Sequence, residues 1–272
     1  MLMEQDYCIG SNRLRVKWDN EELGHVIGMF FAPWICTDGE PNDEIAVTST
    51  DTGYNLKETK NSQSFHCSDK MHLVGELERI MTTYAQQSLD ALLQIHSACV
   101  DFNGQGVLIV GTHGIGKTTL ALESLKEGFR ALTDDISVID MEFRTVKGFP
   151  RPFRVKMNAQ GIASDVPDDC PTYDLYDGFT YVFFHFPEER YYSDVSEIKH
   201  VIFPRRYKGP TQISPIGETD AVRLIIQEGI NFYRKDDGCV SDVIELIRAA
   251  QPFELFYEDK QDAVSHIRQM LQ

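Results

Sequence analysis

Residues 111–118 read Gly-Thr-His-Gly-Ile-Gly-Lys-Thr, which has the spacing G-x-x-x-x-G-K-[ST]. Glycine permits backbone angles that turn successive N–H groups inward, where they can hold phosphate oxygens. A helix that begins near Lys117 would point its positive end at the same anion, the ammonium can reach the outer phosphates, and a threonine hydroxyl can coordinate Mg²⁺. The pattern predicts a nucleotide-binding loop made by Gly111, Thr112, His113, Gly114, Ile115, Gly116, Lys117, Thr118 and Thr119.

Two adjacent carboxylates follow at Asp134 and Asp135, the first of them 17 positions after Lys117. One carboxylate of such a pair can bind Mg²⁺, and the other can accept the proton of an attacking hydroxyl. Asp-Asp is also common in turns, but its position after this loop favours phosphoryl transfer. A histidine at a strand start, as at His96, is more often structural, although an imidazole beside Asp134 would tune the proton affinity of that carboxylate.

Two further cations, Arg205 and Arg206, stand in a basic island of an otherwise acidic chain. The planar guanidinium matches phosphate, so these residues could stabilise a transferring phosphoryl group; the alternative is a solvated turn after a strand. The cations of residues 148–154 are more typical of a rigid loop edge.

Composition excludes several classes of protein. The chain has 272 residues, with 26 Lys and Arg against 42 Asp and Glu and a net charge of −16. Such a surface repels nucleic-acid phosphates and anionic lipid, so neither a nucleic acid nor a membrane is expected as a partner. The apolar run 26–36 is too short to span a membrane, and the N-terminus has no secretory pattern. Six scattered cysteines without a C-x-x-C pair predict reduced thiols in a cytoplasmic protein, with no disulfide framework.

Apolar spacing predicts the elements that would position these residues. Residues 1–70 predict a β-rich lobe of short strands and turns, including strands at 14–18 and 45–48. Residues 71–95 have helical spacing and predict a helix that links this lobe to a main body at residues 96–272.

Within the main body, Asn-Gly at 103–104 predicts a hairpin of strands 97–102 and 106–110, because it lies between two apolar runs. A helix is expected at 117–127, stopped by Gly128. The other expected strands are 129–132, 136–140, 153–155, 181–184, 200–203 and 253–257; the other helices are 219–227, 240–250 and 262–271; a polar loop is expected at 164–177.

The segment HSACVDFNGQGVLIVGTHGIGKT at 96–118, followed by GFRALTDD at 128–135, resembles the catalytic domain of HPr serine kinase/phosphorylase and its relatives. The close resemblance spans residues 95–140, a looser one continues to about residue 230, and the first 70 residues do not share it. It implies an α/β fold, with a P-loop core of the HPr kinase/phosphoenolpyruvate carboxykinase-like type beside the N-terminal β-rich lobe.

The resemblance also implies a function. It implies a homo-oligomeric kinase that uses ATP and Mg²⁺ to phosphorylate a serine hydroxyl. By matching positions, Asp134 would be the base, His96 its partner and Asp135 a Mg²⁺ contact. The loop motif adds Lys117 as a catalytic cation and Thr118 as a Mg²⁺ contact, and the basic island adds Arg205 and Arg206 as catalytic cations.

The chain departs from the family pattern at two places. His113 replaces the usual serine of the loop, and near residues 160–161 Gln-Gly stands where the family has a metal-binding glutamate. We therefore expect kinase activity without the reverse phosphorolysis. The acceptor could be an HPr-like protein or the C-terminal serine of a lasso-peptide precursor. The alternatives are a nucleotide-binding regulator that transfers no phosphate and a kinase of a small molecule such as free serine.

Overall fold

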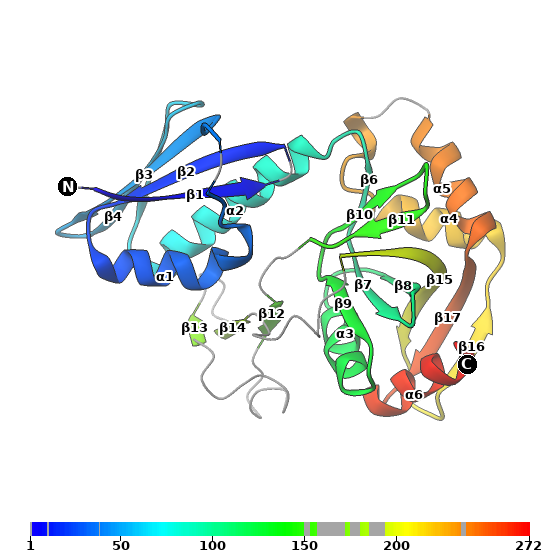
Figure 1. Ribbon diagram of the computed structural model, residues 1–272. Helices are drawn as coiled ribbons and strands as arrows, with labels where there is room; N and C mark the ends of the chain where they lie inside the picture. The colour runs from blue at the N-terminus through cyan, green and yellow to red at the C-terminus, as the bar shows by residue number, and fades with distance from the viewer. Residues whose placement is uncertain are drawn as a thin grey trace. The chain divides into compact units, whose positions relative to one another are not determined.

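The computed structural model describes residues 2–9, 11–37, 39–149, 153–156, 172–174, 180–184, 194–234 and 238–272. The chain forms two units, one of residues 1–91 with 151–185 and one of residues 92–150 with 186–272 (Figure 1). This division differs from the expected one, because the helix expected as a linker packs on the sheet of the first unit and ends at Ser88.

A five-stranded sheet in the order β1-β2-β3-β4-β5 forms most of the first unit. Its elements are β1 (Met3–Ile9), β2 (Asn12–Trp18), α1 (Glu21–Phe31), η1 (Ala32–Trp34), β3 (Asp43–Thr50), β4 (Gly53–Glu58), β5 (Gln63–Cys67) and α2 (Lys70–Ser88). Neighbouring strands are antiparallel except β2 and β3, which run parallel, as a pair joined through a crossover helix does. That helix is α1, which the reading of residues 1–70 as strands and turns did not predict.

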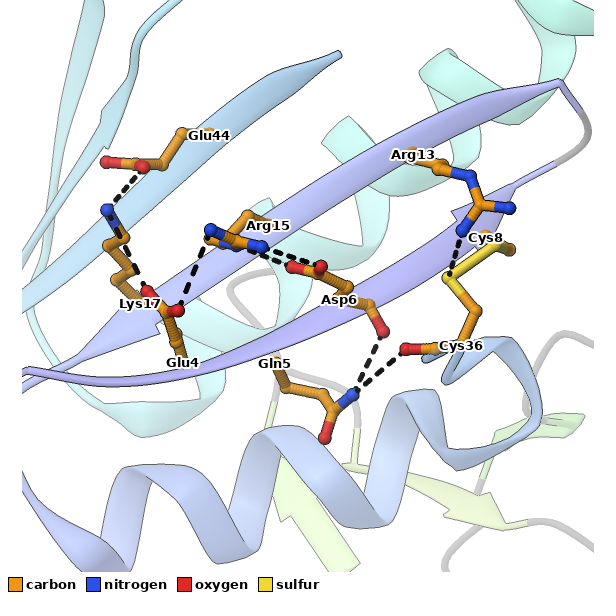
Figure 2. A network of polar contacts seen from close by, with 9 residues as sticks. All are labelled: Glu4, Gln5, Asp6, Cys8, Arg13, Arg15, Lys17, Cys36 and Glu44. Carbon is orange, nitrogen blue, oxygen red and sulfur yellow. Dashed lines mark hydrogen bonds and ion pairs between the residues drawn. A yellow bond between two sulfur atoms is a disulfide. The ribbon is translucent and has the colours of Figure 1, made fainter. Parts of the chain in front are cut away.

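Cys8 and Cys36 form a disulfide that connects β1 to the segment after η1 (Figure 2). The expectation of reduced thiols is wrong for this pair. Helix α1 and η1 return the chain to β1, which brings the Cα atoms of two cysteines 28 positions apart to 5.6 Å. Three other cysteines are free and buried, and Cys170 lies outside the described residues; the three are Cys67, Cys99 and Cys239.

Ion pairs beside the disulfide connect β1, β2 and β3 (Figure 2). Arg15 donates two hydrogen bonds to the carboxylate of Asp6, at 2.7 and 2.8 Å, and these bonds lower the pKa of Asp6. Lys17 contacts Glu44 of the neighbouring strand at 2.5 Å. Each pair is partly exposed, so each contributes about 0.2–1 kcal/mol and helps to hold the strand register.

The described residues between 151 and 185, which also belong to the first unit, form a three-stranded sheet in the order β12-β14-β13. Its strands are β12 (Phe153–Lys156), β13 (Thr172–Asp174) and β14 (Thr180–Phe184), which confirms the strands expected at 153–155 and 181–184. Residues 160–161, most of the expected loop at 164–177 and part of the segment 148–154 lie outside the described residues.

A nine-stranded sheet is the centre of the second unit, with the order β6-β10-β11-β15-β8-β7-β9; β17 pairs with β15, and β16 pairs with β17. Its strands are β6 (Leu93–Ile95), β7 (Ser97–Phe102), β8 (Gln105–Val110), β9 (Arg130–Thr133), β10 (Ser137–Asp140), β11 (Thr145–Lys147), β15 (Val195–Arg206), β16 (Gln212–Pro215) and β17 (Gln251–Tyr257). The helices are α3 (Lys117–Lys126), α4 (Glu218–Gln227), η3 (Phe232–Arg234), α5 (Gly238–Ala249) and α6 (Lys260–Met270).

Helices cover both faces of this sheet. Along β8, Val107 and Ile109 pack with buried residues of α3 and α6, whereas Leu108 and Val110 pack with those of α4 and α5. This alternation follows from the two-residue period of a strand. The predicted α/β class is confirmed, and so are the hairpin, the helices after it and most of the strands. The end of the expected helix 71–95 is wrong, because residues 93–95 form β6 instead.

Candidate functional site

One edge of the second unit's sheet collects most of the predicted residues. Strands β15 and β17 run parallel to β8, and β9 does so as well because both β8 and β9 are antiparallel to β7. Their carboxyl ends, Val110, Thr133, Arg206 and Tyr257, therefore point to the same edge. Strand β7 starts there too, since Ser97 is paired with Val110. Ligands of α/β proteins usually bind outside the carboxyl ends of the strands.

The loop between β8 and α3 requires glycine at Gly116. This residue is the N-cap of α3 and has a φ of 108°, in the left-handed region that favours glycine. A Cβ atom there would also lie 2.7 Å from the Tyr257 Oη and 3.0 Å from an Arg206 guanidinium nitrogen. Gly114 has a φ of 81°, with open space around it. The N-terminus of a ten-residue helix therefore opens onto this loop.

Lys117, the first residue of α3, is 6% exposed and bends back over its own loop. Its Nζ donates to the carbonyl oxygens of Gly111 at 2.6 Å and Thr112 at 3.3 Å. Burial lowers the pKa of Lys117, while three carboxylates nearby, those of Glu228, Asp135 and Asp134, act in the opposite direction. The ammonium thus lies within electrostatic range of three acids.

The two adjacent aspartates contact different partners. The Oδ1 of Asp134, which is 6% exposed, accepts a hydrogen bond of 2.8 Å from the Thr118 hydroxyl. The Oδ1 of Asp135 lies 2.9 Å from the Nε2 of His96, and its side chain is 37% exposed. Asp135 has a φ of 78°, which is uncommon for a residue with a side chain.

His96 bridges two carboxylates. Its Nδ1 lies 2.9 Å from Glu228 Oε2, opposite the contact of Nε2 with Asp135. The hydrogen bond to Asp135 raises the pKa of His96, against the effects of burial and of Lys117. We expected His96 beside Asp134; the structure joins it instead to the next residue. Glu228, 132 positions away in the sequence, was not predicted at all.

The two arginines at the end of β15 differ in their surroundings. The Arg206 guanidinium lies 4.6 Å from the centre of the Tyr257 ring, beside Gly116. The Tyr257 hydroxyl donates to the carbonyl of Ile115 at 3.2 Å, and burial raises the pKa of this phenol. Arg205 forms an ion pair with Glu254 at 3.2 Å. Consecutive strand residues point to opposite faces, which could have predicted that only one arginine faces the loop.

The structure thus pairs Thr118 with Asp134 and His96 with Asp135, places Lys117 within electrostatic range of both aspartates, and puts Arg206 at the loop. Within the loop, Thr112, His113 and Gly114 are exposed, and Ile115 and Thr119 are partly buried. Besides Glu228, sequence reasoning missed Tyr257, because its only signal was its place at the end of an expected strand.

The oxygen donors of this network suit a hard cation. Thr118 and Asp134 offer a hydroxyl and a carboxylate oxygen, the ligand types that Mg²⁺ prefers. Within the described ranges, no three His, Cys, Asp or Glu side chains are arranged to hold a metal by themselves. In those same ranges, every helix is too short or too polar to cross a membrane.

Comparisons with known proteins find relatives of the sequence that contains this site. Residues 87–158 match the family model of the HPr serine kinase C-terminal domain. The HPr kinase/phosphorylase of Lactobacillus johnsonii is 34% identical over 88 residues, which are 32% of this chain and 28% of the relative. That of Geobacillus thermodenitrificans is 33% identical over 108 residues, which are 40% of this chain and 35% of the relative.

A solved structure, the HPr(Ser) kinase/phosphatase from Coxiella burnetii, matches 66% of this chain and 99% of its own at 12% identity. Its TM-score of 0.30 is too low to support a statement about the fold. The chain spans about a third of the length of the two curated relatives described above.

Proposed function

Because this chain belongs to an HPr kinase-like family, we propose that it is an ATP-dependent kinase that transfers the γ-phosphoryl group to a serine hydroxyl of a protein or peptide. The observation that carries this proposal is the convergence at one sheet edge of a glycine loop on a helix N-terminus, a buried lysine and two aspartates. Phosphoryl transfer depends on positioning and on neutralising charge, and this edge offers groups for both.

The loop is proposed as the phosphate site of a P-loop core. The N–H groups of Gly114, Gly116, Lys117 and Thr118 would hold the β-phosphate at the positive end of α3. The Lys117 ammonium would exchange its two carbonyl partners for phosphate oxygens. The exchange is electrostatically favourable because phosphate oxygens carry full negative charge, whereas carbonyl oxygens carry only partial charge.

Arg206 is proposed as the second phosphate cation. Its guanidinium lies beside Gly116 and over the Tyr257 ring, so it can reach an anion in the loop without leaving its support. Arg205 is bound to Glu254 and is not included. This narrows the expectation drawn from the sequence, which treated both arginines as catalytic.

Asp135 is the proposed proton acceptor, and Asp134 with Thr118 is the proposed Mg²⁺ pair. This reverses the assignment that the family resemblance implies, because the Thr118 hydroxyl contacts Asp134 and His96 contacts Asp135. When bound, Mg²⁺ supplies charge neutralisation on the phosphate oxygens. In the transfer, the serine oxygen bonds to the γ-phosphorus, the bond to the β–γ bridging oxygen breaks, ADP leaves, and the hydroxyl proton passes to Asp135.

The acceptor is proposed from the relatives. Their name identifies HPr as the protein on which they act, so an HPr-like protein is the first acceptor to test, followed by a peptide with a C-terminal serine. Assembly into a homo-oligomer stays a prediction.

The test incubates the purified chain with γ-labelled ATP and Mg²⁺ in the presence of HPr, a peptide ending in serine, or free serine. The proposal expects label on the serine of the protein or of the peptide, and none with Lys117→Met. ATP binding without transfer to any acceptor would favour a nucleotide-binding regulator. Label on free serine alone would indicate a small-molecule kinase.

A further inference from the structure

Glu228 occupies a position that is electrostatically unfavourable for a helix. It is the C-cap of α4, and its N–H donates to the carbonyls of Ile225 and Ile226. The C-terminal end of a helix carries partial negative charge, so a carboxylate there is destabilising unless a cation compensates it. The Glu228 side chain is only 11% exposed, which removes most of the compensation that water could provide.

The main chain around Glu228 is fixed to strand β6. The His96 N–H donates to the Glu228 carbonyl at 2.8 Å, and Ile230 N–H donates to the Gln94 carbonyl at 2.9 Å. Asn231, 1% exposed, extends this pairing by accepting from the Gln94 N–H at 3.1 Å. Residues 228–231 therefore lie along the outer side of β6 and hold the Glu228 side chain beside the Nδ1 of the imidazole.

The carboxylate meets the imidazole on the side away from Asp135. Glu228 Oε2 lies 2.9 Å from Nδ1, and Asp135 Oδ1 lies 2.9 Å from Nε2, so the ring cannot rotate without losing both contacts. The charged groups that act on His96 come from three segments: Asp135 after β9, Lys117 of α3 and Glu228 at the end of α4.

We propose that Glu228 is a positioning residue: it holds the His96 ring so that Nε2 faces Asp135, and through the ring it sets the direction in which Asp135 meets the acceptor hydroxyl. This inference rests on the proposed kinase function. Natural proteins keep locally unfavourable groups chiefly at functional sites, which argues for a role beyond folding.

The experiment compares Glu228→Gln with Glu228→Ala. Both remove the negative charge beside Lys117, but only glutamine keeps an oxygen that can accept from Nδ1. We expect Glu228→Gln to stay within about 3-fold of wild-type kcat, and Glu228→Ala to lose about 10–100-fold, the scale of a misplaced catalytic group. The ATP dissociation constant should be equal in the two variants. Glu218→Ala, at the exposed start of the same helix, is the matched control and should leave kcat unchanged.

A double-mutant cycle separates positioning from other effects. In a His96→Ala background, Glu228→Ala should lower kcat no further, because its action passes through the ring. An equal loss in both backgrounds, or full activity of Glu228→Ala, overturns the inference. The same four proteins unfolded in urea give an activity-independent measure of the Glu228–His96 coupling, and no coupling there also overturns it. If the wild-type chain binds ATP but phosphorylates no acceptor, the proposed function itself is refuted, whatever the Glu228–His96 coupling measured in urea.

Discussion

The assignment of the two aspartates can be decided by replacing each with asparagine. Asparagine keeps an oxygen at the same position, so Asp135→Asn can still accept from the His96 Nε2 and Asp134→Asn can still accept from the Thr118 hydroxyl. Each change therefore removes charge and basicity and leaves the geometry. Since Asp135 is 37% exposed, the loss of its ion pair should lower the free energy of unfolding by no more than about 1 kcal/mol.

The expected kinetic effect of Asp135→Asn is much larger. A positioned general base contributes roughly 10²–10⁴-fold to the rate, which corresponds to about 3–5 kcal/mol of transition-state stabilisation. We expect kcat to fall by that factor while the dissociation constant for ATP changes less than about 3-fold, because the Asp135 side chain acts on the acceptor. For Asp134→Asn we expect a Mg²⁺ requirement raised about 10-fold or more, because an amide oxygen binds Mg²⁺ more weakly than a carboxylate.

The assay is steady-state transfer of labelled phosphate over a matrix of ATP and Mg²⁺ concentrations, with urea unfolding of each variant. Asp220→Asn, in an exposed pair with Arg223 on α4, is the control that should change none of these quantities. Suppose instead that Asp135→Asn keeps a near-normal kcat and Asp134→Asn stays inactive at saturating Mg²⁺. Then Asp134 is the base, as the family resemblance implies, and the reasoning from the Thr118 and His96 contacts is refuted.

Three further predictions concern other groups. Arg206→Ala should slow phosphoryl transfer by roughly 10²–10³-fold at saturating ATP, while Arg205→Ala stays near wild type; equal rates in the two variants would contradict the placement of Arg206 at the loop. Cys8→Ser should lower the free energy of unfolding by about 3–4 kcal/mol without reductant and by little with it, because the bond to Cys36 closes a loop of 28 positions. An equal loss under both conditions would argue against the disulfide. Burial lowers the pKa of His200 below 6.5, so the free energy of unfolding should fall as the pH drops below 6.5, where the unfolded chain takes up this proton first; urea titrations of His200→Leu should lack that component of the slope, and an unchanged slope would exclude it.

Local sequence signals predicted most helices and strands of the second unit, because turn residues and apolar spacing there agree with the fold. Asn103 and Gly104 have φ values of 55° and 81°, which a two-residue hairpin turn between right-handed strands requires. Two failures have local causes. Helix α1 begins where the Asn20 side chain accepts from the Leu23 N–H at 2.9 Å, and the prediction overlooked this cap and the helical spacing of its buried residues Leu23, Ile27, Phe30 and Phe31. Residues 93–95 continue the apolar spacing of α2 and yet pair with β10.

Contacts between distant segments could not be predicted. Nothing near residue 228 in the sequence indicates that a glutamate after α4 contacts a histidine before β7, because the contact depends on residues 228–231 lying along β6. The disulfide is a similar case, since it depends on α1, which was not foreseen. For the same reason, the family resemblance identified the aspartate pair but gave no geometric basis for dividing the roles within it.

That division depends on one backbone angle. In an extended chain, Asp134 and Asp135 would point to opposite faces of strand β9, and only one of them could reach the loop. Strand β9 ends at Thr133, and the left-handed conformation of Asp135 then turns the chain. One carboxylate lies against Thr118 at the start of α3, and the next lies against His96 just before β7. Positive φ is uncommon for a residue other than glycine, and functional sites are among the places where it is found. The same turn therefore supplies both an acid beside the helix N-terminus, where a cation and phosphates would be held, and a more exposed acid where a hydroxyl could approach.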